Sequence, residues 1–120
     1  MKYMLLIYDN PDTRELFFSP ENQGLMREMD ALLAELRSAG ELIATDGLAD
    51  PSQTQTVRWQ DGVPAVTDGP LAEAKEHFGG YLIVDVESRD RALEIARRWP
   101  SVRFAPMEVR PLMGGSAEEL

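Results

Sequence analysis

The hydrophobic and polar positions of the chain fall into two patterns, short apolar runs bounded by turn residues and longer segments with helical spacing. The apolar runs predict strands over residues 2–8, 41–48, 54–59, 63–67, 80–87 and 102–110. Helices are predicted over residues 20–39, 71–77 and 89–99, and the two long helices each carry one continuous apolar face. Residues 11–20 show neither pattern and are expected to form a loop.

Residues with strong positional preferences support these boundaries. Ser19 and Ser88 are predicted N-caps, and Gly40 is the expected end of the first long helix. The sequence Gln60-Asp61-Gly62 predicts a hairpin turn between two strands. The sequence Asp68-Gly69-Pro70 predicts a turn that leads into the short helix.

The order of these elements predicts an α+β fold of the ferredoxin-like βαββαβ type, with the hairpin and the short helix inserted between its halves. The two long helices should cover one face of the sheet. The run Tyr3-Met4-Leu5-Leu6-Ile7 is apolar on both faces, so the second face also needs a cover. We therefore expect a homodimer whose sheets pack face to face. Residues 1–113 are expected to form one domain and residues 114–120 a mobile acidic tail.

Composition narrows the classes of function. The 120 residues carry a net charge of −9 and include no cysteine. The charge argues against binding nucleic acid or an anionic membrane surface, because both need a basic patch. The absence of cysteine removes disulfides and thiolate ligands, which fits a cytoplasmic protein. The apolar run over residues 1–8 is too short to span a membrane, so no membrane association is expected.

Polar residues concentrate in residues 67–81, between the hairpin and the next predicted strand. This segment contains Thr67-Asp68-Gly69-Pro70, Ala72-Glu73-Ala74-Lys75-Glu76 and Gly79-Gly80-Tyr81. Together with the strand over residues 2–8 and with Glu108-Val109-Arg110-Pro111, it resembles the Asp-Gly-Pro-Phe (DGPF) type of the YCII-related domain family. The resemblance covers nearly the whole chain.

The resemblance implies a ferredoxin-like dimeric α/β barrel, in a family whose members mostly have no assigned activity. Some enzymes of the wider superfamily look to depend on a His/Asp pair, and DGPF-type proteins are often encoded beside sigma factors. The chain departs from this pattern in two places. Leu71 stands where the motif has Phe, and the only histidine is His77, whereas the enzymes carry theirs early in the chain.

Three carboxylates of this segment, Asp68, Glu73 and Glu76, are candidate catalytic residues. Asp68 can act as a general base in a pocket or cap the short helix, and the two roles can coexist. Glu73 and Glu76 share one face of that helix, where burial would separate their pKa values for acid–base chemistry. On an exposed helix the same residues form a solvated face.

Five further side chains are candidate ligand-binding groups: Tyr8, Arg58, Lys75, His77 and Arg110. Inward-facing Arg58 or Arg110 needs a carboxylate or an anionic ligand as partner, and on the surface either one forms ordinary salt bridges. His77 can catalyse a proton transfer or end the short helix. One histidine without cysteine makes no metal ligand set, and no phosphate-binding glycine motif occurs, so neither metal nor cofactor is expected.

Two functions remain open. In the first, the chain binds or transforms a small organic molecule without a cofactor, in a cleft between the sheet and the inserted hairpin and short helix. In the second, it is a non-enzymatic regulatory or interaction module, linked to transcription through a sigma factor. The polar density of residues 67–81 favours the first function. The acidic charge and the absence of an early histidine favour the second.

Overall fold

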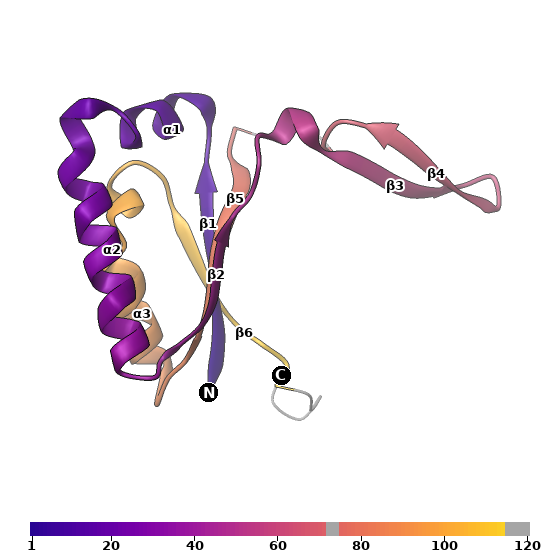
Figure 1. The fold of residues 1–120 in the computed structure, drawn as a ribbon. Helices are drawn as coiled ribbons and strands as arrows, with labels where there is room; N and C mark the ends of the chain where they lie inside the picture. Colours follow the sequence, from indigo (N-terminus) through magenta and orange to yellow (C-terminus); the bar gives the residue numbers. More distant parts are fainter. Residues whose placement is uncertain (72–74, 115–120) are drawn as a thin grey trace.

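The computed structural model describes residues 1–71 and 75–114, and Figure 1 shows the arrangement of its elements. In chain order they are β1 (Lys2–Asp9), α1 (Pro11–Phe17), η1 (Pro20–Asn22), α2 (Gln23–Ser38), β2 (Leu42–Gly47), η2 (Pro51–Gln53), β3 (Gln55–Gln60), β4 (Val63–Asp68), β5 (His77–Asp85), α3 (Arg89–Arg98), η3 (Pro100–Arg103) and β6 (Met107–Pro111), where η marks a 3₁₀-helical turn. Of the predicted acidic tail, only Gly114 lies within the described residues. No helix in the described ranges is long and apolar enough to cross a membrane.

The main sheet has the strand order β2-β5-β1-β6, and every pair of neighbouring strands is antiparallel. The strands β3 and β4 form a separate two-stranded sheet. The helices lie on one side of the main sheet (Figure 1). The result is an α+β architecture that fits the predicted ferredoxin-like plan with an inserted hairpin.

Alternation along the strands determines which residues form the core. Tyr3 and Leu5 of β1 lie opposite Val84 and Leu82 of β5, and all of these side chains are buried. The helices and the residue that follows them add Leu32, Leu33, Leu36, Ala92, Ile95, Ala96 and Trp99. The core therefore lies between the main sheet and the pair of helices α2 and α3, as their helical spacing predicts.

The other side of the main sheet carries none of the described helices, and we call it the helix-free face (Figure 1). By alternation it presents Met4, Leu6 and Tyr8 of β1 and Tyr81 and Ile83 of β5. Each of these side chains is only partly buried. Phe78 packs edge-on against Tyr8, with ring centroids 5.9 Å apart. These apolar side chains of the sheet are thus left partly exposed by residues 1–71 and 75–114.

The helix α1 corrects the predicted loop over residues 11–20. Asn10 accepts a hydrogen bond from the Thr13 backbone N–H at 2.9 Å, and the Thr13 hydroxyl accepts one from the Asn10 N–H at 2.9 Å. This reciprocal capping box, with Pro11 in the first turn, is enough to start a short helix without a regular apolar pattern. The predicted cap Ser19 makes no side-chain capping bond, and the long helix begins only at Gln23.

Two further predictions about elements are wrong. The short helix over residues 71–77 does not form at its described ends, because Leu71, Lys75 and Glu76 lie in bends and His77 begins β5. Pairing with β1 extends β5 backwards, and this tertiary contact outweighs the local helix signal. The strand over residues 102–110 begins only at Met107, because Pro100 starts a 3₁₀-helical turn before it.

The hairpin of β3 and β4, which we call the arm, extends away from the main sheet on its helix-free side (Figure 1). Asp61 and Gly62 form the predicted turn at its tip, with φ values of 53° and 80°. At its root the Thr56 hydroxyl donates a hydrogen bond to the Gly69 carbonyl at 2.7 Å. This bond joins the two sides of the arm at its base and does not reach the main sheet.

Candidate functional site

Asp9 and His77 face each other at the end of the main sheet. Asp9 is the last residue of β1, His77 is the first residue of β5, and the two are paired in the register. Directly opposite residues of antiparallel strands place their side chains on the same face. Asp9 continues the alternation of Leu5 and Ile7, so the pair lies on the helix-covered side, at the open end of the core. The fold thereby assembles a carboxylate and an imidazole from distant parts of the sequence.

Two charged residues from other elements stand near this pair. Arg14 comes from α1, and Asp50 caps η2 by accepting a hydrogen bond from the Ser52 backbone N–H at 2.9 Å. That bond to the carboxylate lowers the pKa of Asp50. The four side chains of Asp9, Arg14, Asp50 and His77 form what we call the charged cluster.

Burial raises the pKa of Asp9 above the ordinary value for an aspartate, and the negative charge of Asp50 adds to this rise. The positive charges of Arg14 and His77 act in the opposite direction without cancelling the effect of burial. No hydrogen bond from a described residue lowers the pKa of this carboxylate. Asp9 is therefore a partly desolvated acid that holds its proton to a higher pH than usual, near a cation.

Three connected hollows surround the charged cluster. The smallest, of about 220 Å³, is lined by all four of its members together with Asn10, Pro11 and Pro51. A second, of about 400 Å³, shares Asp9 and Arg14 and has the apolar walls Ile7, Phe18, Met29, Leu33, Leu48 and Trp99. A third, of about 730 Å³, shares Asp50 and His77 and lies at the root of the arm. The cluster thus stands between an apolar hollow and the base of the arm.

Gly79 determines where the Asp9 carboxylate can lie. A Cβ atom at this position would sit 2.6 Å from Asp9 Oδ2 and 2.8 Å from Asp9 Cγ. The register of β1 and β5 is irregular at this point, between Ile7 and Tyr8. A glycine in a strand interior often marks such a close approach. The carboxylate therefore lies over the backbone of β5 because that backbone carries no side chain there.

This arrangement suits binding and proton transfer. An apolar hollow of about 400 Å³ can take a small ring or a short apolar chain, and Asp9 and Arg14 at its wall can orient a polar substituent. A carboxylate with a raised pKa beside an imidazole is a common acid–base combination. Among residues 1–71 and 75–114, no group of three histidine or carboxylate side chains is placed to hold a metal ion.

Two of the residues predicted from the sequence lie at the site. His77 is part of the charged cluster, and Glu76 lines the hollow at the root of the arm together with Pro70 and Leu71. His77 does so as the first residue of a strand rather than the last residue of a helix. The predicted segment therefore reaches the site through its C-terminal end.

The other predicted residues of this segment are placed differently. Asp68 is the last residue of β4 and accepts a hydrogen bond from the Gln55 side chain at 3.4 Å. Arg58 is exposed on the arm and donates to the Leu71 carbonyl at 3.1 Å. Lys75 is exposed in a bend, and Glu73 lies outside the described residues. The structure does not bring Asp68, Arg58 and Lys75 together with the charged cluster.

Tyr8 and Arg110 lie on the helix-free face. Glu108 raises the pKa of Tyr8 through a side-chain hydrogen bond and through its charge, burial adds to the rise, and Arg110 lowers it. Glu108 and Arg110 lie opposite Leu6 and Met4 of β1. These polar groups form a second cluster, on the opposite side of the sheet from the charged cluster.

Sequence reasoning missed Asp9, Arg14 and Asp50. Arg14 lies inside the segment predicted as a loop, and Asp9 and Asp50 lie just outside the predicted strands. A usable signal was present at Asn10, where an N-cap residue followed by a proline and Thr13 indicates the start of a short helix. This helix contains Arg14 and follows directly on the end of β1. The pairing of Asp9 with His77 has no local signal, because it arises from the register of two distant strands.

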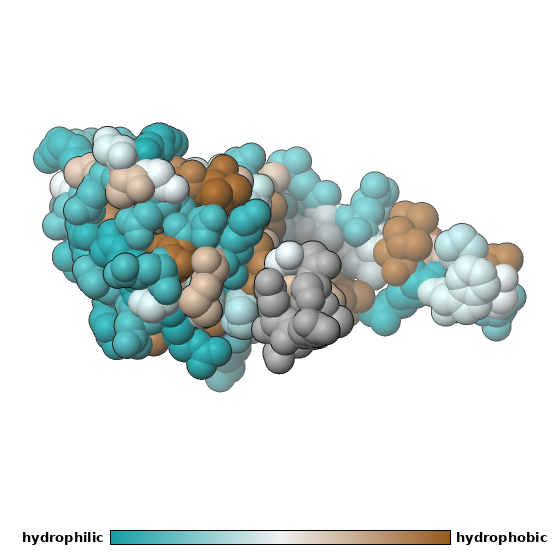
Figure 2. Space-filling model, turned by 90° about the horizontal axis from the view of Figure 1, so that it is seen from below, coloured by the Kyte–Doolittle hydropathy of each residue, from teal (hydrophilic) through white to brown (hydrophobic). Residues whose placement is uncertain are grey.

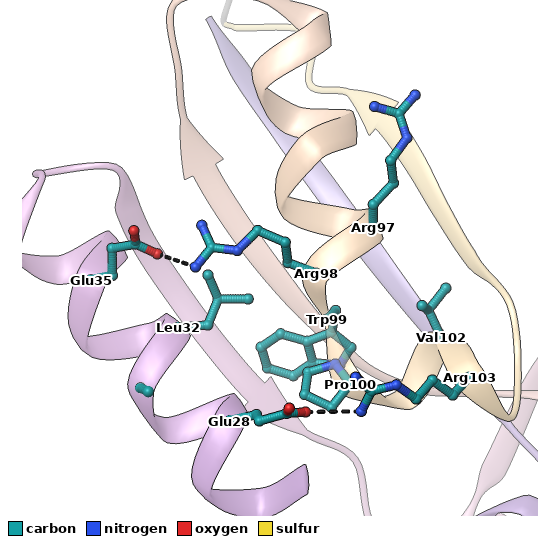
Figure 3. Close-up of a pocket in the computed structure, with 10 residues that line it drawn as sticks. Glu28, Leu32, Glu35, Arg97, Arg98, Trp99, Pro100, Val102 and Arg103 are labelled. Carbon is teal, nitrogen blue, oxygen red and sulfur yellow. Dashed lines mark hydrogen bonds and ion pairs between the residues drawn. The ribbon is translucent and has the colours of Figure 1, made fainter.

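A separate groove beside the core lacks the free charged groups of this site. It measures about 650 Å³ and runs between α2 and the residues that follow α3, with Trp99 and Pro100 at its base (Figure 3). Its carboxylates already have partners, since Glu28 pairs with Arg103 at 2.8 Å and Glu35 with Arg98 at 2.6 Å. Figure 3 shows both ion pairs spanning the groove. Both carboxylates that line this groove are therefore already held in ion pairs.

Comparison with known proteins identifies relatives of the whole chain. A model of the YCII-related domain matches residues 1–114. An uncharacterized protein of Rhizobium meliloti (strain 1021) is 32% identical over 114 residues, which make up 93% of this chain and 92% of the relative. A 5-chloro-2-hydroxyhydroquinone dehydrochlorinase from Burkholderia phenoliruptrix AC1100, solved in complex with 2,5-dihydroxybenzoquinone, has a similar fold, with a TM-score of 0.53, 16% identity and 98% of each chain covered. At this identity the similarity shows a shared fold.

Proposed function

We propose that this chain, which belongs to the YCII-related domain family, binds and transforms a small organic molecule by proton transfer at Asp9 and His77. The family itself is the one that the segment around residues 67–81 predicted. One observation carries the proposal. A partly desolvated carboxylate of raised pKa is paired in the sheet with a histidine and lies, with an arginine, at the wall of an apolar hollow.

The chemistry follows from these groups. A hydroxylated molecule seated in the apolar hollow would give its hydroxyl proton to the Asp9 carboxylate, which accepts protons at a higher pH than an ordinary aspartate. The resulting oxyanion would lie beside the Arg14 guanidinium, whose charge favours it. His77 would donate or remove a second proton. These steps use side chains alone, which is why the proposal includes no cofactor.

The fold neighbour suggests which ligands to test first. The dehydrochlorinase acts on a chlorinated hydroxyhydroquinone and was solved with a dihydroxybenzoquinone. Such molecules combine a flat apolar ring with acidic hydroxyl groups, and the hollow combines apolar walls with Asp9 and Arg14. We therefore take hydroxylated quinones and hydroquinones as the ligand class.

Thermal unfolding with 2,5-dihydroxybenzoquinone and hydroxyhydroquinone as probes tests this function. A ligand at one hundred times its Kd stabilises the folded chain by about 2.7 kcal/mol, which is readily measured. We expect the wild type to be stabilised and the Asp9→Asn and His77→Gln variants to lose most of that effect. Asp30→Asn, an exposed aspartate of α2, is the matched control and should behave like the wild type.

The outcomes separate the two functions considered from the sequence. If the wild type is not stabilised by any member of the class, enzymatic use of this hollow is contradicted and the non-enzymatic interaction module becomes the better account. If Asp9→Asn and Asp30→Asn bind equally well, the hollow binds ligands but the charged cluster does not act on them. Either result would be visible without knowing the natural substrate.

The finer features of the fold form part of the same proposal. We propose a DGPF-type member with the ferredoxin-like topology, in which two copies pack their helix-free faces together as a dimeric α/β barrel. The partly buried Met4, Leu6 and Ile83 on that face support this contact, because none of the described helices covers them. Light scattering at micromolar concentration tests it, and a monomer would contradict it.

A further inference from the structure

The arm exposes more apolar surface than it can cover by itself. Trp59 is 75% exposed, Val57 63% and Val66 62%. The register places Val57 opposite Val66 and Trp59 opposite Pro64, so these side chains share one face of the hairpin. We call them the apolar face of the arm. Figure 2 shows hydrophobic patches along the arm where it extends beyond the body.

No other described element supports the arm along its length. The strands β3 and β4 pack extensively only on each other. A two-stranded hairpin by itself is only marginally stable in water. Tryptophan, here exposed at position 59, is also one of the residues most enriched where protein interfaces bind most strongly. The apolar face of the arm therefore needs a partner from outside the chain.

A second copy of the chain fits this need better than an unrelated protein. The arm and the helix-free face lie on the same side of the molecule (Figure 1). Both carry apolar side chains that the described residues leave exposed, so one contact related by a two-fold axis can bury both sets at once. Such an isologous contact closes on itself and leaves no open apolar surface for further growth.

The arm is long enough to reach across such a contact. Facing sheets pack about 10 Å apart, and each six-residue strand of the arm is about 20 Å long. The arm therefore extends roughly 10 Å past the plane of a facing sheet. That overlap is enough to place Trp59, near the tip, against the body of the partner.

We propose that each copy lays the apolar face of its arm against the other copy, so that two chains exchange arms across the contact between their helix-free faces. This inference rests on the sheet-to-sheet dimer proposed above and extends it. It also bears on the site, because Asp50 and His77 line the hollow at the root of the arm. A partner that holds the arm in place would therefore also hold the wall of the hollow that contains Asp50 and His77.

The dimer dissociation constant, measured by light scattering over a dilution series, gives the first test. Losing a central tryptophan anchor costs on the order of 30-fold in affinity, so Trp59→Ser should weaken the dimer by about that factor. Val57→Ser should weaken it less, in the same direction. Val63→Ser is the matched control, since Val63 is 57% exposed but lies opposite Gln60 on the other face of the arm. Equal dissociation constants for all three variants would overturn the proposal.

A second test asks directly whether the arm touches the other copy. The chain has no cysteine, so Gln60→Cys creates a single attachment point for a nitroxide label near the tip of the arm. The labelled copy, without isotopes, is mixed with ¹⁵N-labelled wild type. Only contact between copies can then broaden the amide signals of the wild-type chain.

We expect broadening that is confined to one surface of the wild-type copy. A label at Arg27→Cys, on the exposed side of α2, is the control and should leave that surface unaffected. A dimer without broadening from the arm label overturns arm exchange and leaves the sheet-to-sheet dimer in place. A monomer in light scattering overturns both, and neither result depends on whether the hollow binds a ligand.

Discussion

Two carboxylates of this chain lie in similar surroundings, but their pKa values are shifted in opposite directions. Glu41, just before β2, and Asp9, at the end of β1, are both partly buried near an arginine. Glu41 accepts two hydrogen bonds from Arg91 of α3, at 2.8 and 2.9 Å, and these bonds lower the pKa of Glu41. Asp9 lies near Arg14 without such bonds, and burial raises its pKa. Geometry, and not the mere presence of a cation, decides the direction.

This difference in hydrogen bonding distinguishes a pair that stabilises the fold from a carboxylate that can bind a ligand. The Glu41–Arg91 pair links the start of β2 to α3, and each charge of the pair is neutralised by the other. The pairing also raises the pKa of Arg91. The charges around Asp9 are left incompletely satisfied by the described residues, next to a hollow that a ligand can enter. Proteins keep such unsatisfied groups where a ligand or substrate completes them.

The largest effect on stability should come from breaking the satisfied pair. Arg91→Ala leaves Glu41 partly buried without its partner, and losing a two-pronged charged hydrogen bond costs about 2–3 kcal/mol. Chemical denaturation measures this loss. Glu94→Ala is the control, because Glu94 contacts the same arginine from an exposed position and its pairing contributes about 0.5 kcal/mol or less. Equal losses for the two variants would show that Glu41–Arg91 is an ordinary surface pair.

Gly79→Ala should disturb the site by moving the Asp9 carboxylate. The added methyl group meets Asp9 Oδ2 at 2.6 Å, so the aspartate must turn away or the strands must separate. Overpacking of this kind costs about 1–2 kcal/mol, and ligand binding at the hollow should be lost with it. Gly24→Ala, in the first turn of α2 with open space around it, is the matched control and should not destabilise the chain. Retained ligand binding in Gly79→Ala would mean that the position of Asp9 is not critical.

The elements that the sequence predicts well are those specified by local signals. The run of β1 alternates onto a buried face, Ser88 caps α3 by accepting a hydrogen bond from the Arg91 N–H at 3.1 Å, and Asp61-Gly62 forms the expected turn. The apolar stripe of α2 is likewise buried as its spacing predicts. In each of these cases the interaction that fixes the element involves residues only a few positions apart in the sequence.

The site could not be predicted in the same way. Asp9 and His77 meet only because β1 and β5 are neighbours in this register, and the irregularity near Gly79 adjusts which residues face each other. The polar density of residues 67–81 pointed to the right part of the chain but to Asp68 rather than to the Asp9 that His77 faces. A segment that starts a strand in the structure was interpreted as a helix, because the strand is specified by its distant partner.

Opposite dependences on pH should distinguish the two carboxylates. The pKa of Asp9 is raised in the folded state, so its ionisation favours unfolding as the pH rises above the ordinary value of 3.8. Because solvent screens this partly buried charge, Asp9→Asn should stabilise the chain only slightly at neutral pH and not at all below that value. The pKa of Glu41 is lowered, so its contribution is present above 4.5 and is lost as the pH falls through the folded-state value.

Urea denaturation at pH 7 and at pH 3 measures both dependences. Glu41→Gln should be less stable than wild type at pH 7, with a difference that shrinks in acid, whereas Asp9→Asn should be more stable at pH 7 and equal in acid. If Asp9→Asn destabilises the chain at neutral pH, the carboxylate is satisfied by a partner and the contrast with Glu41 fails. That outcome would also weaken the case for proton transfer at this residue.

The smallest effect should come from the two ion pairs that span the groove of Figure 3. Glu35–Arg98 and Glu28–Arg103 have distances of 2.6 and 2.8 Å, as short as those of Glu41–Arg91, but their side chains are 44–55% exposed. Exposed pairs contribute about 0.5 kcal/mol each, and salt screens most of that. Glu28→Gln and Glu35→Gln should therefore each lower the free energy of unfolding slightly in dilute buffer and not at all in 1 M salt, while Arg91→Ala stays destabilising in both. A loss at Glu35 as large and as salt-resistant as that at Arg91 would show that short distance alone, without burial, is enough to make a structural pair in this chain.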